Sequence, residues 1–128
     1  MFVKLISLLG ALFAGLSVVF SAAFAHLPQW ALGVPGPVQT ALAQQQFHAL
    51  GLLLVGLAIR QRGASRWLLA AAGLMLCGML LFSFNIYARH LLGWDGLRTL
   101  VPWGGGAWIA AWGALAWGLI QKVPNDPD

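Results

Sequence analysis

The chain has 128 residues, of which 60% are hydrophobic and 8% are charged, and its formal net charge is +4. With a mean hydropathy of +0.81, it has too much apolar surface for one water-soluble core beneath a polar exterior. This composition excludes a soluble enzyme. The scattered basic residues form no stripe that would bind nucleic acid. We therefore expect an all-α membrane protein whose solvent is the lipid bilayer.

Apolar stretches predict a single transmembrane domain over residues 1–128, built as a four-transmembrane-helix bundle with short loops. A bilayer core of about 30 Å needs roughly 20 residues of α-helix, and the chain has room for four such spans. The expected helices cover 3–25, 38–60, 66–88 and 100–121, followed by a flexible tail over 122–128.

The first helix ends in Ala23-Phe24-Ala25, which resembles a signal-peptidase site. A cleaved signal peptide, leaving His26 as the new N-terminal residue, is therefore an alternative to a retained helix. We favour the retained helix because the apolar run exceeds the usual 7 to 15 residues of a signal peptide, as a rough guide. Small residues along this helix predict a packing seam. They are Gly10, Ala14, Ser17 and Ser21.

The second helix carries polar residues inside its apolar span. Gln44, Gln45 and His48 share a helical face with Gly51, and this face is expected to point into the bundle. Two interpretations of His48 stay open. It is either an interhelical hydrogen-bond lock, which we favour, or a functional histidine that handles protons or a ligand.

The third helix divides its polar residues between two faces. Ser83 and Tyr87 lie on one face, and Asn85 and Arg89 lie on the other, so they do not all line one pocket. We expect Arg89 to extend to lipid headgroups. An alternative pairs Asn85 with His48 or with the fourth helix.

The fourth helix has small residues at every fourth position, which predict a second packing seam. They are Gly106, Ala110, Ala114 and Gly118. This seam and the seam of the first helix are expected either to meet each other or to serve a second copy of the chain. Trp108 and Trp112 lie on another face, where we expect contact with lipid or a partner.

Basic residues predict the orientation, because the cytoplasmic loops of membrane proteins are enriched in lysine and arginine. Five of the seven lie on the side shared by both termini and the second loop, and two lie on the other side. The first group is Lys4, Arg60, Arg62, Arg66 and Lys122; the second is Arg89 and Arg98. We therefore expect both termini in the cytoplasm and a multi-pass protein of the bacterial inner membrane.

Motifs for catalysis and for metal binding are missing from the sequence. It contains no nucleophile elbow, phosphate loop or paired carboxylates, and its acids are Asp95, Asp126 and Asp128. It also lacks metal-ligand spacings such as H-x-x-x-H. We expect no enzyme activity, no catalytic residues, no metal and no cofactor.

Several short motifs together resemble the small membrane proteins grouped as domain of unknown function 423 (DUF423), over nearly the whole chain. The motifs are Ser21-Ala22-Ala23-Phe24-Ala25-His26, Gln45-x-Phe47-His48-Ala49-Leu50, Phe82-Ser83-x3-Tyr87, and Pro102-x-Gly104-Gly105 with Trp112. Where the family usually has tyrosines, this chain has Gln44 and Phe47. The resemblance implies a four-helix integral membrane protein and brings no established activity.

These observations favour a non-enzymatic helix bundle that forms a homo-oligomer or joins a larger membrane complex. The alternative is a small permease or proton-linked carrier with a polar cavity around His48, near the outer leaflet. The candidate polar cluster for such a cavity comprises His26, Gln44, Gln45, His48, Asn85 and Tyr87.

Overall fold

The computed structural model describes residues 1–122, and this part of the chain is helical without any strand. In chain order the elements are α1 (Phe2–Ala25), the 3-10 turn η1 (Pro28–Trp30), α2 (Gly36–Arg62), α3 (Arg66–Gly78), the π-helical segment η2 (Met79–Phe84), α4 (Asn85–Leu92), the 3-10 turn η3 (Arg98–Leu100) and α5 (Val101–Ile120). α3, η2 and α4 form one continuous rod. Of the tail expected over 122–128, all but Lys122 lies outside the described residues.

Proline, serine and glycine set the helix ends. α2 begins at Gly36 with Pro37 in its first turn, where the missing N–H costs little. Ser65 caps α3 by accepting a 3.2 Å hydrogen bond from the backbone N–H of Leu68. α4 continues past residue 88, where the third span was expected to end, and stops at Gly93, whose φ of 66° is left-handed.

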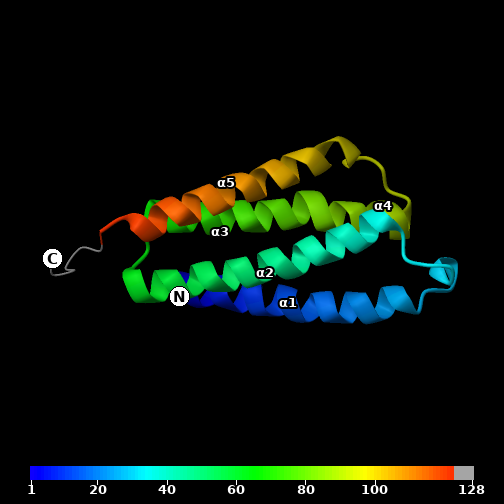
Figure 1. Ribbon diagram of the computed structural model, residues 1–128, viewed down its shortest axis with the longest axis horizontal. Coiled ribbons are helices and arrows are strands. Elements are labelled where there is room, and N and C mark those ends of the chain that lie inside the picture. Colours follow the sequence, from blue (N-terminus) through cyan, green and yellow to red (C-terminus); the bar gives the residue numbers. More distant parts are fainter. Residues whose placement is uncertain (123–128) are drawn as a thin grey trace.

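The helices pack as two close pairs, α1 with α2 and α3 with α5, and α2 joins the pairs by lying against α3 (Figure 1). Glycines make both close approaches possible. A Cβ at Gly10 of α1 would lie 2.6 Å from the backbone nitrogen of Leu53 in α2. A Cβ at Gly104 of α5 would lie 2.7 Å from the backbone nitrogen of Phe82. Close backbone contact is how helices associate where lipid removes the hydrophobic driving force between them.

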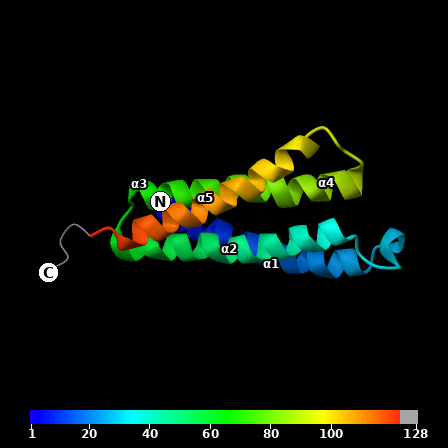
Figure 2. The same ribbon diagram turned by 45° about the horizontal axis from the view of Figure 1, so that its top comes forward.

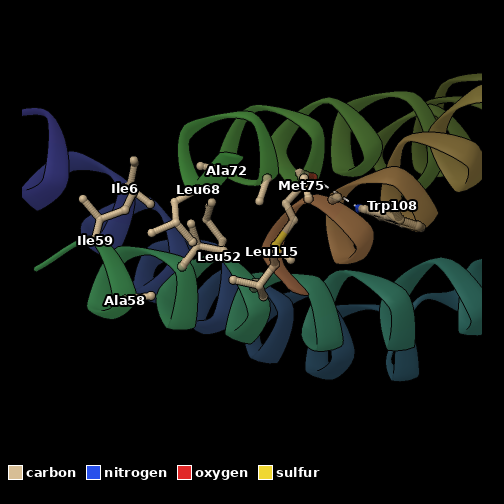
Figure 3. Packing of buried hydrophobic residues seen from close by; sticks show 14 of the residues in the cluster. Ile6, Leu52, Ala58, Ile59, Leu68, Ala72, Met75, Trp108 and Leu115 are labelled. Carbon is tan, nitrogen blue, oxygen red and sulfur yellow. Dashed lines mark hydrogen bonds between the residues drawn. The ribbon is translucent and has the colours of Figure 1, made fainter. Parts of the chain in front are cut away.

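An apolar core fills the part of the bundle nearest the end of α5. It includes Leu52 of α2, Leu68 and Met75 of α3, and Leu115 of α5, with Trp108 at one edge (Figure 3). These side chains are at most 4% exposed. This end of the bundle is therefore close-packed.

Three helical segments are long and apolar enough to cross a membrane: α1, α2 and the continuous rod Arg66–Leu92. These three segments indicate a membrane protein. α5 is not among these three segments. It is a 20-residue helix, but its tryptophans and glycines contribute little hydropathy.

The ends of the rods fall into two groups (Figure 1). The N-terminus, the turn after α2 and the end of α5 lie at one end of the bundle. The connections 26–35 and 93–100 lie at the other. α5 crosses the bundle obliquely, so that its first turns move away from α2 (Figure 2).

Candidate functional site

Gln45 is the centre of a buried polar network that joins three helices. Its Nε2 donates a 3.0 Å hydrogen bond to the carbonyl of Phe13 in α1, and its Oε1 accepts a 2.7 Å hydrogen bond from the hydroxyl of Tyr87 in α4. Beside it, the Ser83 hydroxyl donates to the carbonyl of Ala41 at 2.7 Å. The interhelical lock that was predicted for His48 is therefore made by Gln45, Tyr87 and Ser83, which we call the Gln45 lock.

His48 points toward α5 instead of toward the Gln45 lock. Its Nδ1–H donates to the carbonyl of Gln44 at 2.8 Å, one turn earlier in the same helix. The imidazole lies flat on the indole of Trp108, with ring centroids 3.9 Å apart and planes 6° apart. Only 4% of His48 is exposed. His48 sits midway along α2.

A groove of about 330 Å³ lies beside His48, between α2 and the diverging first half of α5. Phe82 of η2 contributes to its wall. Two exposed side chains, Phe47 and Ile109, also line it, so the groove opens sideways to the surface of the bundle. We call it the His48 groove. Its lining residues are Gln44, Phe47, His48, Phe82, Gly105, Trp108, Ile109 and Trp112.

The other members of the expected polar cluster lie apart from this groove. Asn85 uses its Nδ2 to donate to the carbonyl of Leu97 at 2.6 Å and to that of Leu81 at 3.0 Å, so the alternative that paired it with His48 or the fourth helix is wrong. His26 is exposed in the first connection. The six residues therefore do not form one cluster. Gln44 and His48 border the groove, and Gln45 and Tyr87 belong to the lock.

Arg89 forms an ion pair with the loop that follows α4. Its Nε lies 3.0 Å from a carboxylate oxygen of Asp95, and both side chains are exposed. This pair ties the end of α4 to the loop that leads into α5.

The predicted seam of the fourth helix is divided. Ala114 and Gly118 are buried, and a Cβ at Gly118 would lie 2.9 Å from the Leu68 side chain of α3. Gly106 and Ala110 are exposed, and a Cβ at Gly106 would meet nothing within 4 Å.

The seam of the first helix is used within the bundle. Gly10 and Ser17 are buried, Ala14 is half-buried, and Ser21 is exposed. One of the two expectations was that this seam meets the seam of the fourth helix. It does not, because Gly10 packs on α2.

Trp108 is the residue that the sequence placed least well. Lipid or partner contact was expected, yet its side chain is buried and its Nε1–H donates to the carbonyl of Met75 at 3.2 Å (Figure 3). The ring lies against Gly78, where any side chain would collide with it.

Among residues 1–122, no group of three or more histidine, cysteine or acidic side chains is placed to hold a metal ion. Cys77 is exposed on the bundle surface. In the groove, the ring neighbours of His48 are Phe47, Trp108 and Trp112.

The family model described as "Protein of unknown function (DUF423)" matches residues 20–105, from the end of α1 to the first turns of α5. Neither the curated proteins nor the solved structures contain a match. The matched region includes the Gln45 lock and the α2 side of the His48 groove.

Proposed function

Since the chain belongs to the DUF423 family, whose function is unknown, we propose that it acts as a non-enzymatic bundle that associates with other proteins inside the membrane. In this proposal all four rods cross the bilayer, and both termini lie in the cytoplasm of a bacterial cell. The partner is a second copy of the chain or a larger membrane complex.

The packing of α5 supports a fourth span. The helix rises about 30 Å over its 20 residues, at 1.5 Å per residue, which equals the thickness of a hydrocarbon core. It lies along α3, which belongs to a rod apolar enough to span a membrane. At the end of the bundle that holds Arg60, Arg62 and Arg66, the guanidinium of Arg62 donates to the carbonyl of Gln121 at 2.8 Å. Basic residues at that end favour the cytoplasmic side.

The observation that carries the proposal is an exposed row on α5 made of small residues between two tryptophans. Its spacings alternate between three and four, as in helix pairs that pack at a shallow angle. A Cβ at Gly106 or Gly113 would meet nothing within 4 Å, so a partner helix has room to approach. We call this row the association face. Its members are Trp103, Gly106, Ala110, Gly113 and Trp117, all of them exposed.

We propose no catalytic role because of where the polar groups are placed. The acid in the described part of the chain, Asp95, is engaged by Arg89 in an exposed loop, whereas His48 lies midway along α2. His48 therefore has no carboxylate to orient it as a general base.

The carrier alternative has less support. A carrier needs a route from its site to both sides of the membrane, and beyond His48 the bundle is filled by Leu52, Met75 and Leu115 (Figure 3). The groove instead opens sideways, past Phe47 and Ile109.

The association is tested by counting subunits with native mass spectrometry of protein released from lipid nanodiscs. The double variant Gly106→Leu/Ala110→Leu should reduce the oligomer to single subunits, because leucine keeps a partner helix at a distance. Gly73→Leu is the matched control, since Gly73 is also exposed with nothing within 4 Å of its Cβ, but it lies on α3. If the double variant keeps the parent's subunit number, the association face is wrong.

A further inference from the structure

We propose that the His48 groove is a binding site for a phenol dissolved in the membrane, meaning an apolar molecule that carries an aromatic hydroxyl group. The hydroxyl would donate a hydrogen bond to Nε2 of His48 while the ring lies among the aromatic walls. The inference rests on the proposed membrane position of the bundle and is independent of its association.

The hydrogen-bonding state of His48 determines what the ligand must offer. A carbonyl oxygen only accepts hydrogen bonds, so the 2.8 Å contact with Gln44 places the proton on Nδ1. In the neutral ring, Nε2 then carries a lone pair and requires a donor. Among the described residues Nε2 has no hydrogen-bond partner, and the one buried side-chain polar atom without a partner is Ser7 Oγ. Nε2 is therefore an unused acceptor that remains accessible from the groove.

The walls of the groove fit an aromatic ring. Trp108 lies flat against one face of the imidazole, and Phe47 meets it edge-on with ring centroids 5.2 Å apart. Trp112 stands 5.3 Å from Phe47, and Phe82 stands 5.0 Å from Trp108. The edge-to-face contact of Phe47 with His48 is one of the arrangements that aromatic rings prefer. The volume of about 330 Å³ lies at the lower end of ligand sites, which span roughly 300 to 1,000 Å³.

The position of the opening indicates where the ligand comes from. His48 lies midway along α2, and the groove opens past Phe47 and Ile109, which are 58% and 77% exposed. In a bilayer this opening faces hydrocarbon rather than water. An apolar tail would extend into lipid while the hydroxyl donates to Nε2 of His48, because an unpaired polar group is costly in such surroundings.

The test compares two probes that differ in a single hydrogen-bond donor. Full-length protein in lipid nanodiscs is titrated with 4-nonylphenol or with its methyl ether, 4-nonylanisole, while imidazole ¹⁵N resonances are recorded. The phenol should shift Nε2 of His48 saturably and leave His26 and His90 unchanged. Its half-saturating concentration should be about fivefold lower than that of the ether, as expected for one neutral hydrogen bond. Equal behaviour of the two probes, or an unmoved His48 signal, would overturn the proposal.

Two variants keep the test independent of fold defects. Gly105 lines the groove, and a Cβ there meets nothing within 4 Å, so Gly105→Leu should fill the groove and abolish the saturable shift without disturbing the bundle. Gly73→Leu, with equal space on α3 outside the lining of the groove, should bind as the parent does. If Gly105→Leu still binds the phenol with the parent's half-saturation, the site is elsewhere.

Subunit counts from the same samples separate this inference from the proposed association. Single subunits that bind the phenol through His48 would contradict the association and support the groove. Oligomers in which both probes behave alike would support the association and contradict the groove as a phenol site.

Discussion

Gln45 and His48 lie three residues apart on α2, and the structure gives them different roles. The Gln45 side chain is fully buried, and both ends of its amide have partners, Phe13 and Tyr87. His48 satisfies Nδ1 within its own helix and leaves Nε2 facing a groove. Burial of a polar group in an apolar medium is costly unless it is hydrogen-bonded. Gln45, whose amide is paired at both ends, therefore stabilises the fold. His48, whose Nε2 is unpaired, can accept a hydrogen bond from a ligand.

The Gln45 lock leads to a prediction about stability. Gln45→Leu removes two interhelical hydrogen bonds and leaves the Tyr87 hydroxyl without its acceptor, so unfolding should become easier by about 1–2 kcal/mol. Tyr87→Phe removes one bond and should cost about 0.6 kcal/mol, the average for such bonds in membranes. Reversible unfolding in mixed detergent micelles measures both values. A Gln45→Leu protein as stable as the parent would show that the lock contributes nothing.

At this scale the sequence predicted which polar residues are buried better than it predicted their partners. Helical spacing correctly placed Ser83 and Tyr87 on one face, and both bond to α2. It did not show that Asn85 bonds to the carbonyl of Leu97, because that contact depends on how the loop before α5 folds back.

At the scale of elements, α5 shows why a simple repeat misled. Positions four residues apart advance 400° around a helix, so a strict four-residue repeat rotates by about 40° per step and by about 120° from Gly106 to Gly118. The repeat therefore begins on the exposed side and ends in the core. Faces that stay aligned alternate spacings of four and three. The buried face is Gly104, Trp108, Ala111, Leu115 and Gly118. Sequence spacing alone could not show which of the aligned faces meets α3.

The π-helical segment η2 leads to a second prediction. A π-helical turn holds one residue more than an α-helical turn, so deleting one residue there restores an α-helix and keeps the direction of the side chains that follow. Deletion of Leu80, which is 59% exposed, should leave Tyr87 facing Gln45 and the protein folded.

The control for this prediction is deletion of Gly73, within the regular helix α3. That deletion turns one part of α3 by about 100° relative to the rest and should lower the unfolding midpoint much more. Equal loss of stability in the two deletions would mean that η2 does not act as an inserted residue.

At the scale of the whole molecule, two helix pairs produce a bundle that is closed at one end and open at the side. The closed end, nearest the end of α5, is filled by apolar side chains around Met75 and Leu115. The open side lies beside His48, where α5 diverges from α2 (Figure 2). Composition predicted the helical class and the apolar spans. The oblique course of α5 follows from the contact of Trp108 with Gly78 and of Gly104 with Phe82, which link distant parts of the sequence. For that reason the groove itself could not be predicted from the sequence.

The central claim is that all four rods cross the membrane with both termini inside the cell. The most direct measurement is labelling of single cysteines by a membrane-impermeant maleimide, in intact spheroplasts and after lysis. The background is Cys77→Ser, and the sites are Leu32→Cys, Ala64→Cys, Leu97→Cys and a cysteine added after Asp128. We predict labelling of the Leu32 and Leu97 sites in intact spheroplasts, and of the other two only after lysis. If the cysteine after Asp128 is labelled from outside together with the Leu97 site, α5 does not cross the bilayer and the account is wrong.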